Sequence, residues 1–256
     1  MGVALLADFA VRLACGLILA LLLISWRAVP LRFFRIQSQV ILGVLVLAGL
    51  AQARTSGLNT GVGLIAASAV LAYLGTVAWG LGLPRIGLGT EILGVVTTAA
   101  WMIGVSRDPD WGVWALNASS RGVSGFLVGA TLTAMLLGHY YLIAPAMTVE
   151  PLKRAVAWIA VGLAARGLLA GIVLGVSRAG WFESGAAGGH LPAEGMLLAA
   201  RWGIGLAGAA LSVELTRRTV RIRSTQSATG ILYITTIFVL FGELTSMIAA
   251  GAGLIG

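Results

Sequence analysis

The amino-acid sequence predicts an all-α integral membrane protein, a bundle of about eight transmembrane helices with both termini outside the cytoplasm. Of its 256 residues 59% are hydrophobic and only 10% are charged, and the mean hydropathy is +0.98. A soluble chain of this length cannot bury so much apolar surface, whereas a polytopic membrane protein exposes it to lipid. No soluble domain fits between the apolar segments, so we expect residues 1–256 to form a single transmembrane domain in the bilayer.

Eight apolar segments approach the length of about 17–25 residues that a membrane-spanning helix needs. They are Val3–Ser25, Ser38–Ala53, Gly61–Leu83, Glu91–Ser106, Gly122–Met147, Arg154–Ser177, Gly195–Thr216 and Gln226–Gly253. Proline, glycine, asparagine or charged residues mark the breaks between them. The second and fourth segments are short, so we expect them to be tilted by their neighbours or to extend beyond these bounds.

Basic residues are distributed unequally between the two sides of the predicted bundle. One side carries ten: Arg27, Arg32, Arg35, Arg85, Lys153, Arg154, Arg217, Arg218, Arg221 and Arg223. The other carries four: Arg54, Arg107, Arg121 and Arg178. Because cytoplasmic loops are enriched in Lys and Arg, the first set is expected in the cytoplasm and both termini outside. The formal charge of +8 then reflects membrane orientation and does not indicate a nucleic-acid partner.

Two opposite charges lie inside the last two apolar segments. Arg201 interrupts the seventh segment and Glu243 the eighth, each about 6 Å outward of the midplane at 1.5 Å rise per residue. A charge inside a membrane is costly when it is alone, so each needs a partner. We therefore expect the two to belong to one buried polar site. The alternative is an interhelical ion pair with only a structural role.

Other polar residues within the segments add candidates to this site. Asp8 and Arg12 have i, i+4 spacing on one helix face, which also suits a pair that only neutralises itself. Arg166, near the middle of its segment, has no obvious acidic partner in the membrane. His139 and Tyr140 lie in the inner half of the fifth segment, where a hydrogen-bonded helix residue and a packing residue are the alternative interpretations.

These residue types suit the binding of a quinone head group. Such a ligand needs hydrogen-bond donors to two carbonyl oxygens and groups that exchange protons, which Arg, His, Tyr and a buried carboxylate provide. Within the membrane segments His139 is the only histidine, so one chain cannot supply bis-histidine haem ligation there. The single cysteine, Cys15, excludes a cysteine-ligated metal cluster within the chain. We expect neither haem nor metal in this chain alone.

The last segment, with Phe241-Gly242-Glu243-Leu244, resembles the closing helix of DMSO reductase-type and NrfD-like membrane anchor subunits. Those helices carry Gly-Glu-Leu followed two residues later by an arginine, whereas this chain has Ser246. The segment with Arg201 is similar to the penultimate helix of the anchors, and the eight-helix plan agrees. The resemblance implies a quinone-interacting, haem-free subunit of a respiratory-type electron-transport complex in the bacterial cytoplasmic (inner) membrane. Its partners would include an iron–sulfur or cytochrome subunit, and Arg201 and Glu243 would be quinone-site candidates.

Two other functions fit the same residues. A proton-coupled transporter of small molecules would use Glu243 or Asp8 as its coupling carboxylate, although the matched Gly/Pro breaks that many transporters show are missing. A non-catalytic scaffold subunit of a larger membrane complex would use the buried charges only to hold its helices together. As part of an oxidoreductase complex, the chain is expected to be either a non-catalytic or a quinone-reactive subunit.

Overall fold

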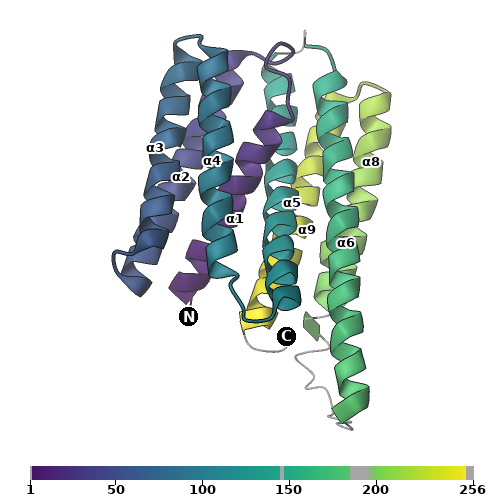
Figure 1. The fold of residues 1–256 in the computed structure, drawn as a ribbon. Helices are drawn as coiled ribbons and strands as arrows, with labels where there is room; N and C mark the ends of the chain where they lie inside the picture. Colours follow the sequence, from purple (N-terminus) through teal and green to yellow (C-terminus); the bar gives the residue numbers. More distant parts are fainter. Residues whose placement is uncertain (1, 145–146, 185–195, 198, 252–256) are drawn as a thin grey trace.

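The computed structural model describes residues 2–144, 147–184, 196–197 and 199–251, and this part of the chain is helical without any strand. The first six helices are α1 (Gly2–Leu22), α2 (Leu31–Ser56), α3 (Thr60–Gly80), α4 (Pro84–Val105), α5 (Trp111–Ile143) and α6 (Glu150–Ser184). A π-helix, η1 (Ala200–Gly208), leads directly into α8 (Ala209–Arg221), and α9 (Thr225–Gly251) follows. The start of α1 and the end of α9 lie at the same end of the bundle, the lower end in Figure 1.

Seven of the described helices are long and apolar enough to cross a membrane, namely α1 to α6 and α9. The chain is thus an all-α protein of membrane-spanning character. Neither η1 nor α8 reaches that length alone, although together they correspond to the predicted segment Gly195–Thr216. The two short predicted segments extend beyond their expected bounds, since α2 begins at Leu31 and α4 at Pro84.

Local sequence signals explain where several helices begin and end. Asn59 caps α3 by accepting a hydrogen bond from the Val62 amide, and Asp110 caps α5 by accepting from the amides of residues 112 and 113. Pro84 occupies the first turn of α4, where its missing N–H costs nothing. Gly57 ends α2 with a φ of 66°, a value that glycine adopts without strain. The cap at Asp110 starts α5 eleven residues before the predicted Gly122, which brings Arg121 into the helix.

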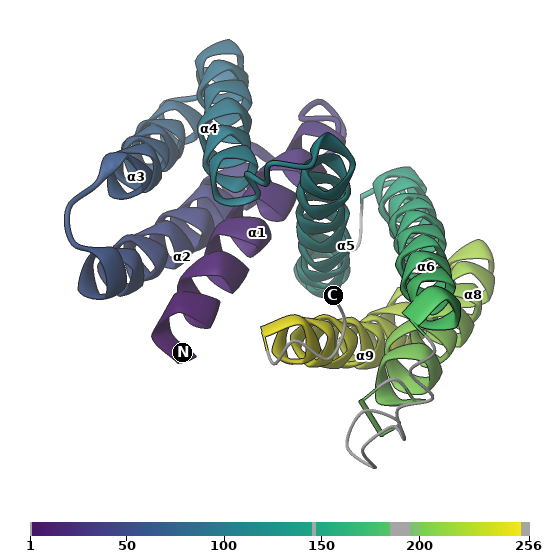
Figure 2. The same ribbon diagram turned by 60° about the horizontal axis from the view of Figure 1, so that its bottom comes forward.

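The helices form two groups around a central pair. α1 and α5 pack on each other in the middle, α2, α3 and α4 lie on one side, and α6, α8 and α9 lie on the other (Figures 1 and 2). A Cβ on Gly16 of α1 would overlap the carbonyl of Gly125 in α5, and one on Gly129 would overlap the Gly16 backbone. These glycines therefore allow the two backbones to touch. By contrast, a Cβ on Gly167 or Gly171 of α6 would meet nothing within 4 Å. These two glycines, although four residues apart, are therefore not sites of close contact with another described helix.

Candidate functional site

Glu243 of α9 is held by a bidentate ion pair with Arg166 of α6. Arg166 Nε donates to Glu243 Oε1 at 2.6 Å and Nη2 to Oε2 at 2.8 Å, and the residues are only 4% and 5% exposed. Ser124 of α5 donates to the same Oε2 at 2.6 Å. Three helices thus meet at one carboxylate. Charge-assisted bidentate hydrogen bonds are stronger than hydrogen bonds between neutral groups, and their geometry fixes the orientation of both side chains.

Two further hydrogen bonds hold the guanidinium group of Arg166. Its Nη1 donates to Ser120 Oγ at 2.9 Å, and Nη2 donates to Ser246 Oγ at 3.1 Å. Ser120 and Ser124 are one helical turn apart on α5, and Glu243 and Ser246 are similarly placed on α9. The guanidinium group therefore joins the facing sides of α5 and α9 from its position on α6.

A second ion pair lies on α1. Arg12 Nε donates to Asp8 Oδ1 at 3.1 Å, and Arg12 Nη2 contacts Oδ2, so the expected i, i+4 pair is formed. Arg121 Nε of α5 lies 3.4 Å from Asp8 Oδ1 without the geometry of a hydrogen bond. Arg121 Nη1 instead donates to Ser106 Oγ at 2.8 Å, at the end of α4. Asp8 consequently sits between two guanidinium groups.

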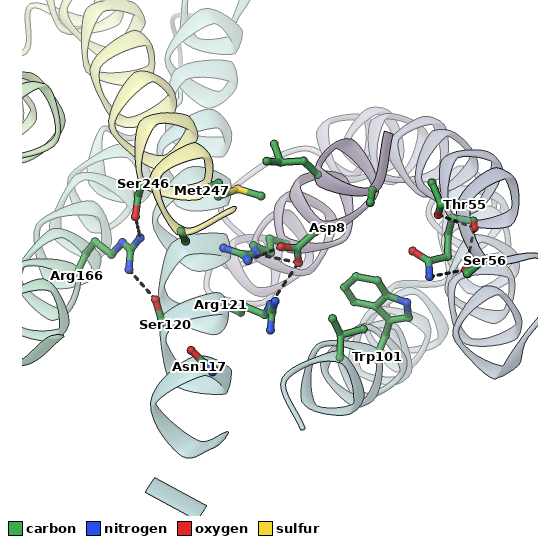
Figure 3. Close-up of a pocket in the computed structure, with 16 residues that line it drawn as sticks. Asp8, Thr55, Ser56, Trp101, Asn117, Ser120, Arg121, Arg166, Ser246 and Met247 are labelled. Atoms are coloured by element: carbon green, nitrogen blue, oxygen red, sulfur yellow. Dashed lines mark hydrogen bonds and ion pairs between the residues drawn. The ribbon is translucent and has the colours of Figure 1, made fainter. Parts of the chain in front are cut away.

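A cavity of about 700 Å³ joins the two ion pairs at the end of the bundle where α1 begins. In Figure 3, Arg166 reaches Ser120 and Ser246 on one side, Asp8 and Arg121 lie in the middle, and Trp101 lies on the other side. Apolar and polar side chains share the wall: Ala4, Leu5, Asp8, Arg12, Gln52, Thr55, Ser56, Trp101, Val105, Asn117, Ser120, Arg121, Arg166, Ser246, Met247 and Ala250.

Arg201 belongs to the same electrostatic environment but is not the partner of Glu243. It is buried in η1 and lies close enough to Arg166 and Glu243 to interact with both charges. Among the described residues, however, no hydrogen bond or ion pair joins Arg201 to Glu243. The alternative of a direct Arg201–Glu243 ion pair is therefore wrong, and so is the expectation that Arg166 lacks an acidic partner. Arg166 instead donates to both carboxylate oxygens of Glu243.

The backbone around Arg201 is itself unusual. A nine-residue π-helix is rare, and short π segments within helices are frequent at functional sites. Gly205 of η1 lies against Gly242 of α9, since a Cβ on Gly205 would be 2.6 Å from the Gly242 Cα. This contact brings η1 against the turn of α9 that carries Glu243. The sequence gives no periodicity signal that distinguishes a π-helix from an α-helix here.

The arginine cluster, which we define as Arg12, Arg121, Arg166 and Arg201 with the carboxylates Asp8 and Glu243, has a formal charge of +2. Electrostatic interactions link Arg12 to Arg121 and Glu243, and Arg201 to Arg166. An excess of guanidinium groups next to a cavity favours ligands with carbonyl, carboxylate or other oxyanion groups. The described residues offer no group of three His, Cys, Asp or Glu side chains that could hold a metal ion.

The sequence-predicted candidates thus separate into two places. Asp8, Arg12, Arg166, Arg201 and Glu243 converge at the cavity end of the bundle. The other two, His139 and Tyr140, lie near the opposite end of α5, where His139 is exposed and Tyr140 packs edge-on against Phe33 at 5.8 Å between ring centroids. They do not line this cavity.

Sequence reasoning missed two polar residues within the helices, the half-buried Arg121 and the buried Glu91. Arg121 was assigned to a loop, although Asp110 is a standard helix-capping residue and indicates an earlier helix start. Glu91 was placed at the edge of a segment, whereas Pro84 at the start of α4 puts it almost two turns inside the helix. Both errors come from taking apolarity alone as the helix boundary.

Comparisons of the chain with protein-family models, with curated proteins and with solved structures found no match in any of the three.

Proposed function

We propose that the protein is a quinone-interacting membrane subunit of a respiratory-type oxidoreductase complex, and that the cavity receives the quinone head group. The observation that carries this proposal is the cavity of about 700 Å³, in which guanidinium, amide and hydroxyl groups share the wall with Trp101 and Met247. A quinone presents two hydrogen-bond acceptors on a flat apolar ring, so it needs this combination of donors and apolar surface.

The proposed topology has eight crossings with both termini outside. Since η1 and α8 are continuous from Ala200 to Arg221, they extend for at most about 33 Å, the length that 22 residues would have at the α-helical rise of 1.5 Å per residue. That length suffices for an eighth crossing of a hydrocarbon core of about 30 Å. The excess of Lys and Arg at the other end of the bundle supports a cavity on the outer side, and we assign the chain to a bacterial cytoplasmic membrane.

The two carboxylates would have different roles during quinone chemistry. Asp8 lines the cavity, so its carboxylate is within reach of protons that a bound quinol releases. Glu243 is engaged by Arg166 and Ser124, so we assign it a positioning role: it fixes the guanidinium of Arg166 at the cavity wall. Arg121 lines the cavity and its side chain is 21% exposed, so its guanidinium is the donor we assign to a quinone oxygen.

The resemblance to DMSO reductase-type and NrfD-like anchors agrees with this assignment. The arginine that those helices carry two residues after Leu is replaced here by Ser246, and Ser246 accepts a hydrogen bond from Arg166. A guanidinium from α6 thus occupies the neighbourhood where the anchors would place one from the last helix. In this proposal, electrons pass between the quinone and an iron–sulfur or cytochrome subunit, and the chain itself needs neither haem nor metal.

Quinone binding can be measured directly on the full chain in lipid nanodiscs. We would titrate a short-chain benzoquinone and a short-chain naphthoquinone and follow quenching of tryptophan fluorescence, since Trp101 lines the cavity. Loss of one charged donor in Arg121→Gln should weaken binding by about 10- to 100-fold. Arg107→Gln, which changes an exposed arginine at the same end of the bundle, should bind as the wild type does. Absence of saturable binding, or equal affinities for both variants, would reject the proposal.

The position of Asp8 also favours a second function, proton-coupled transport of a small molecule through this cavity. Asp8 is the carboxylate that faces the cavity, whereas Glu243 is fully engaged by its partners. Proteoliposomes with an imposed pH gradient should then accumulate a carboxylate-bearing solute, and Asp8→Asn should abolish the uptake. Saturable quinone binding without uptake of any tested solute would decide for the redox function.

A further inference from the structure

Glu91 is a buried carboxyl group that the proposed function does not use. It is 4% exposed on α4, in the half of the bundle farther from the cavity. Ten residues separate it from Trp101, the cavity residue on the same helix, which corresponds to about 15 Å along the axis. Glu91 therefore lies outside the arginine cluster and has surroundings of its own.

Among the described residues, the side chains that contact the carboxyl group of Glu91 offer a hydroxyl and an indole N–H, and neither is a cation. Ser38 Oγ of α2 lies 2.8 Å from Glu91 Oε1, and Trp79 Nε1 of α3 donates to the same oxygen at 3.5 Å. No ion pair of the described residues involves Glu91, and the only side-chain interactions identified at its carboxyl are those with Ser38 and Trp79. An ionised carboxylate in such a place would be desolvated without a cation to compensate for it, and buried acids of this kind take up a proton instead.

The hydrogen bonds around Ser38 fit a proton on Glu91. The Ser38 hydroxyl has one hydrogen, but its oxygen lies 3.0 Å from the Phe34 carbonyl as well as 2.8 Å from Glu91 Oε1. When the hydroxyl donates to Phe34 in the usual manner of a helical serine, the short contact with Glu91 needs a hydrogen from the carboxyl group. A carboxylic acid at Glu91 therefore satisfies both contacts at once, which a carboxylate does not.

Close packing of α3 and α4 leaves little space around the carboxyl group of Glu91. Trp79 lies directly over Gly87, where an added Cβ would be 2.5 Å from the indole ring. A Cβ on Gly75 would be 3.0 Å from Thr90 Oγ1 and 3.5 Å from Glu91 Oε1. The glycines of α3 and α4 thus allow two helices to close around the carboxyl group, and the indole N–H is held beside it.

We propose that Glu91 is a membrane-embedded proton-binding site, protonated at neutral pH, whose proton exchanges with solvent. The exchange is a simple dissociation: the carboxyl O–H bond breaks, the proton passes to water, and Ser38 and Trp79 donate to the carboxylate until a proton returns. The ligand is thus the proton itself, and the site is separate from the cavity that we assign to quinone.

Infrared spectroscopy of the full chain in lipid tests this site. A protonated carboxylic acid has a carbonyl stretch that ionised Asp and Glu lack, and the band moves to lower frequency when D₂O replaces H₂O. We expect this band in the wild type at neutral pH and its loss in Glu91→Gln. Glu243→Gln serves as the matched control and should keep the band, because Glu243 is paired with Arg166 as a carboxylate.

A second variant guards against a change of structure in Glu91→Gln. Ser38→Ala keeps the acid but removes its closest hydrogen-bond partner, so the band should remain and move to higher frequency. Absence of the band from the wild type, or its persistence in Glu91→Gln, would overturn the proposal. A band that is assigned to Glu91 but does not shift in D₂O would show a trapped proton and would overturn the exchange.

Discussion

Glu243 and Glu91 are both buried in membrane-spanning helices, and each contacts a serine hydroxyl from another helix. Their other partners differ. Arg166 donates two hydrogen bonds to Glu243 at 2.6 and 2.8 Å, whereas the other partner of Glu91 in the described part of the chain is the indole N–H of Trp79 at 3.5 Å. Equal burial therefore leads to two different solutions, because one carboxyl group is neutralised by a guanidinium and the other, as we propose, by a proton.

The two solutions suit the two halves of the bundle. Glu243 lies where α5, α6 and α9 meet and where a cavity admits polar groups, so a charged network has neighbours to satisfy it. Glu91 lies between α2, α3 and α4, where glycines bring the helices close and its described hydrogen-bond partners are uncharged. The available partners thus decide which form of the carboxyl group the membrane interior accepts.

The largest expected effect comes from removing Arg166, the cation that pairs with Glu243. Arg166→Met leaves Glu243 as an unpaired buried charge, which should lower the free energy of unfolding by about 3–5 kcal/mol. Thermal or SDS-induced unfolding in detergent measures the loss. The double variant Arg166→Met with Glu243→Met removes both charges and should return to within about 1 kcal/mol of the wild type. Equal stability of the single and double variants would contradict a charge-paired Glu243.

Part of this arrangement was predictable from the sequence. The apolar runs predicted the helices, because a chain in lipid must satisfy its backbone within each segment. The Asp8–Arg12 pair was predictable because four residues on one helix fix the geometry. The Arg166–Glu243 pair was not, since 77 residues separate the partners and the rotation of α6 relative to α9 decides which arginine reaches the carboxylate. Sequence reasoning chose Arg201, whose segment is adjacent in sequence, but η1 does not direct it to hydrogen-bond Glu243.

The two serines offer a smaller but more direct comparison. Ser124→Ala removes a hydrogen bond to a charged carboxylate and should cost about 1.5–3 kcal/mol of unfolding free energy. Ser38→Ala removes a hydrogen bond to a neutral acid and should cost about 0.5–1.5 kcal/mol. Both serines are buried and lie on membrane-spanning helices, so each is the control for the other in the same unfolding assay. A greater loss for Ser38→Ala would indicate that Glu91 carries the charge.

The smallest expected effect is that of Glu91→Gln. A protonated glutamic acid and a glutamine are both neutral, of similar size and able to donate to Ser38 Oγ, so the free energy of unfolding should change by less than about 1 kcal/mol. The same substitution at position 243 leaves Arg166 as an uncompensated buried cation and should cost about 3–5 kcal/mol. Parallel unfolding of the two variants in one detergent measures this difference. Both variants replace a glutamate by a glutamine, so the difference between their losses of unfolding free energy reports the charge that each site holds in the wild type. Equal losses would mean that both sites hold the same charge.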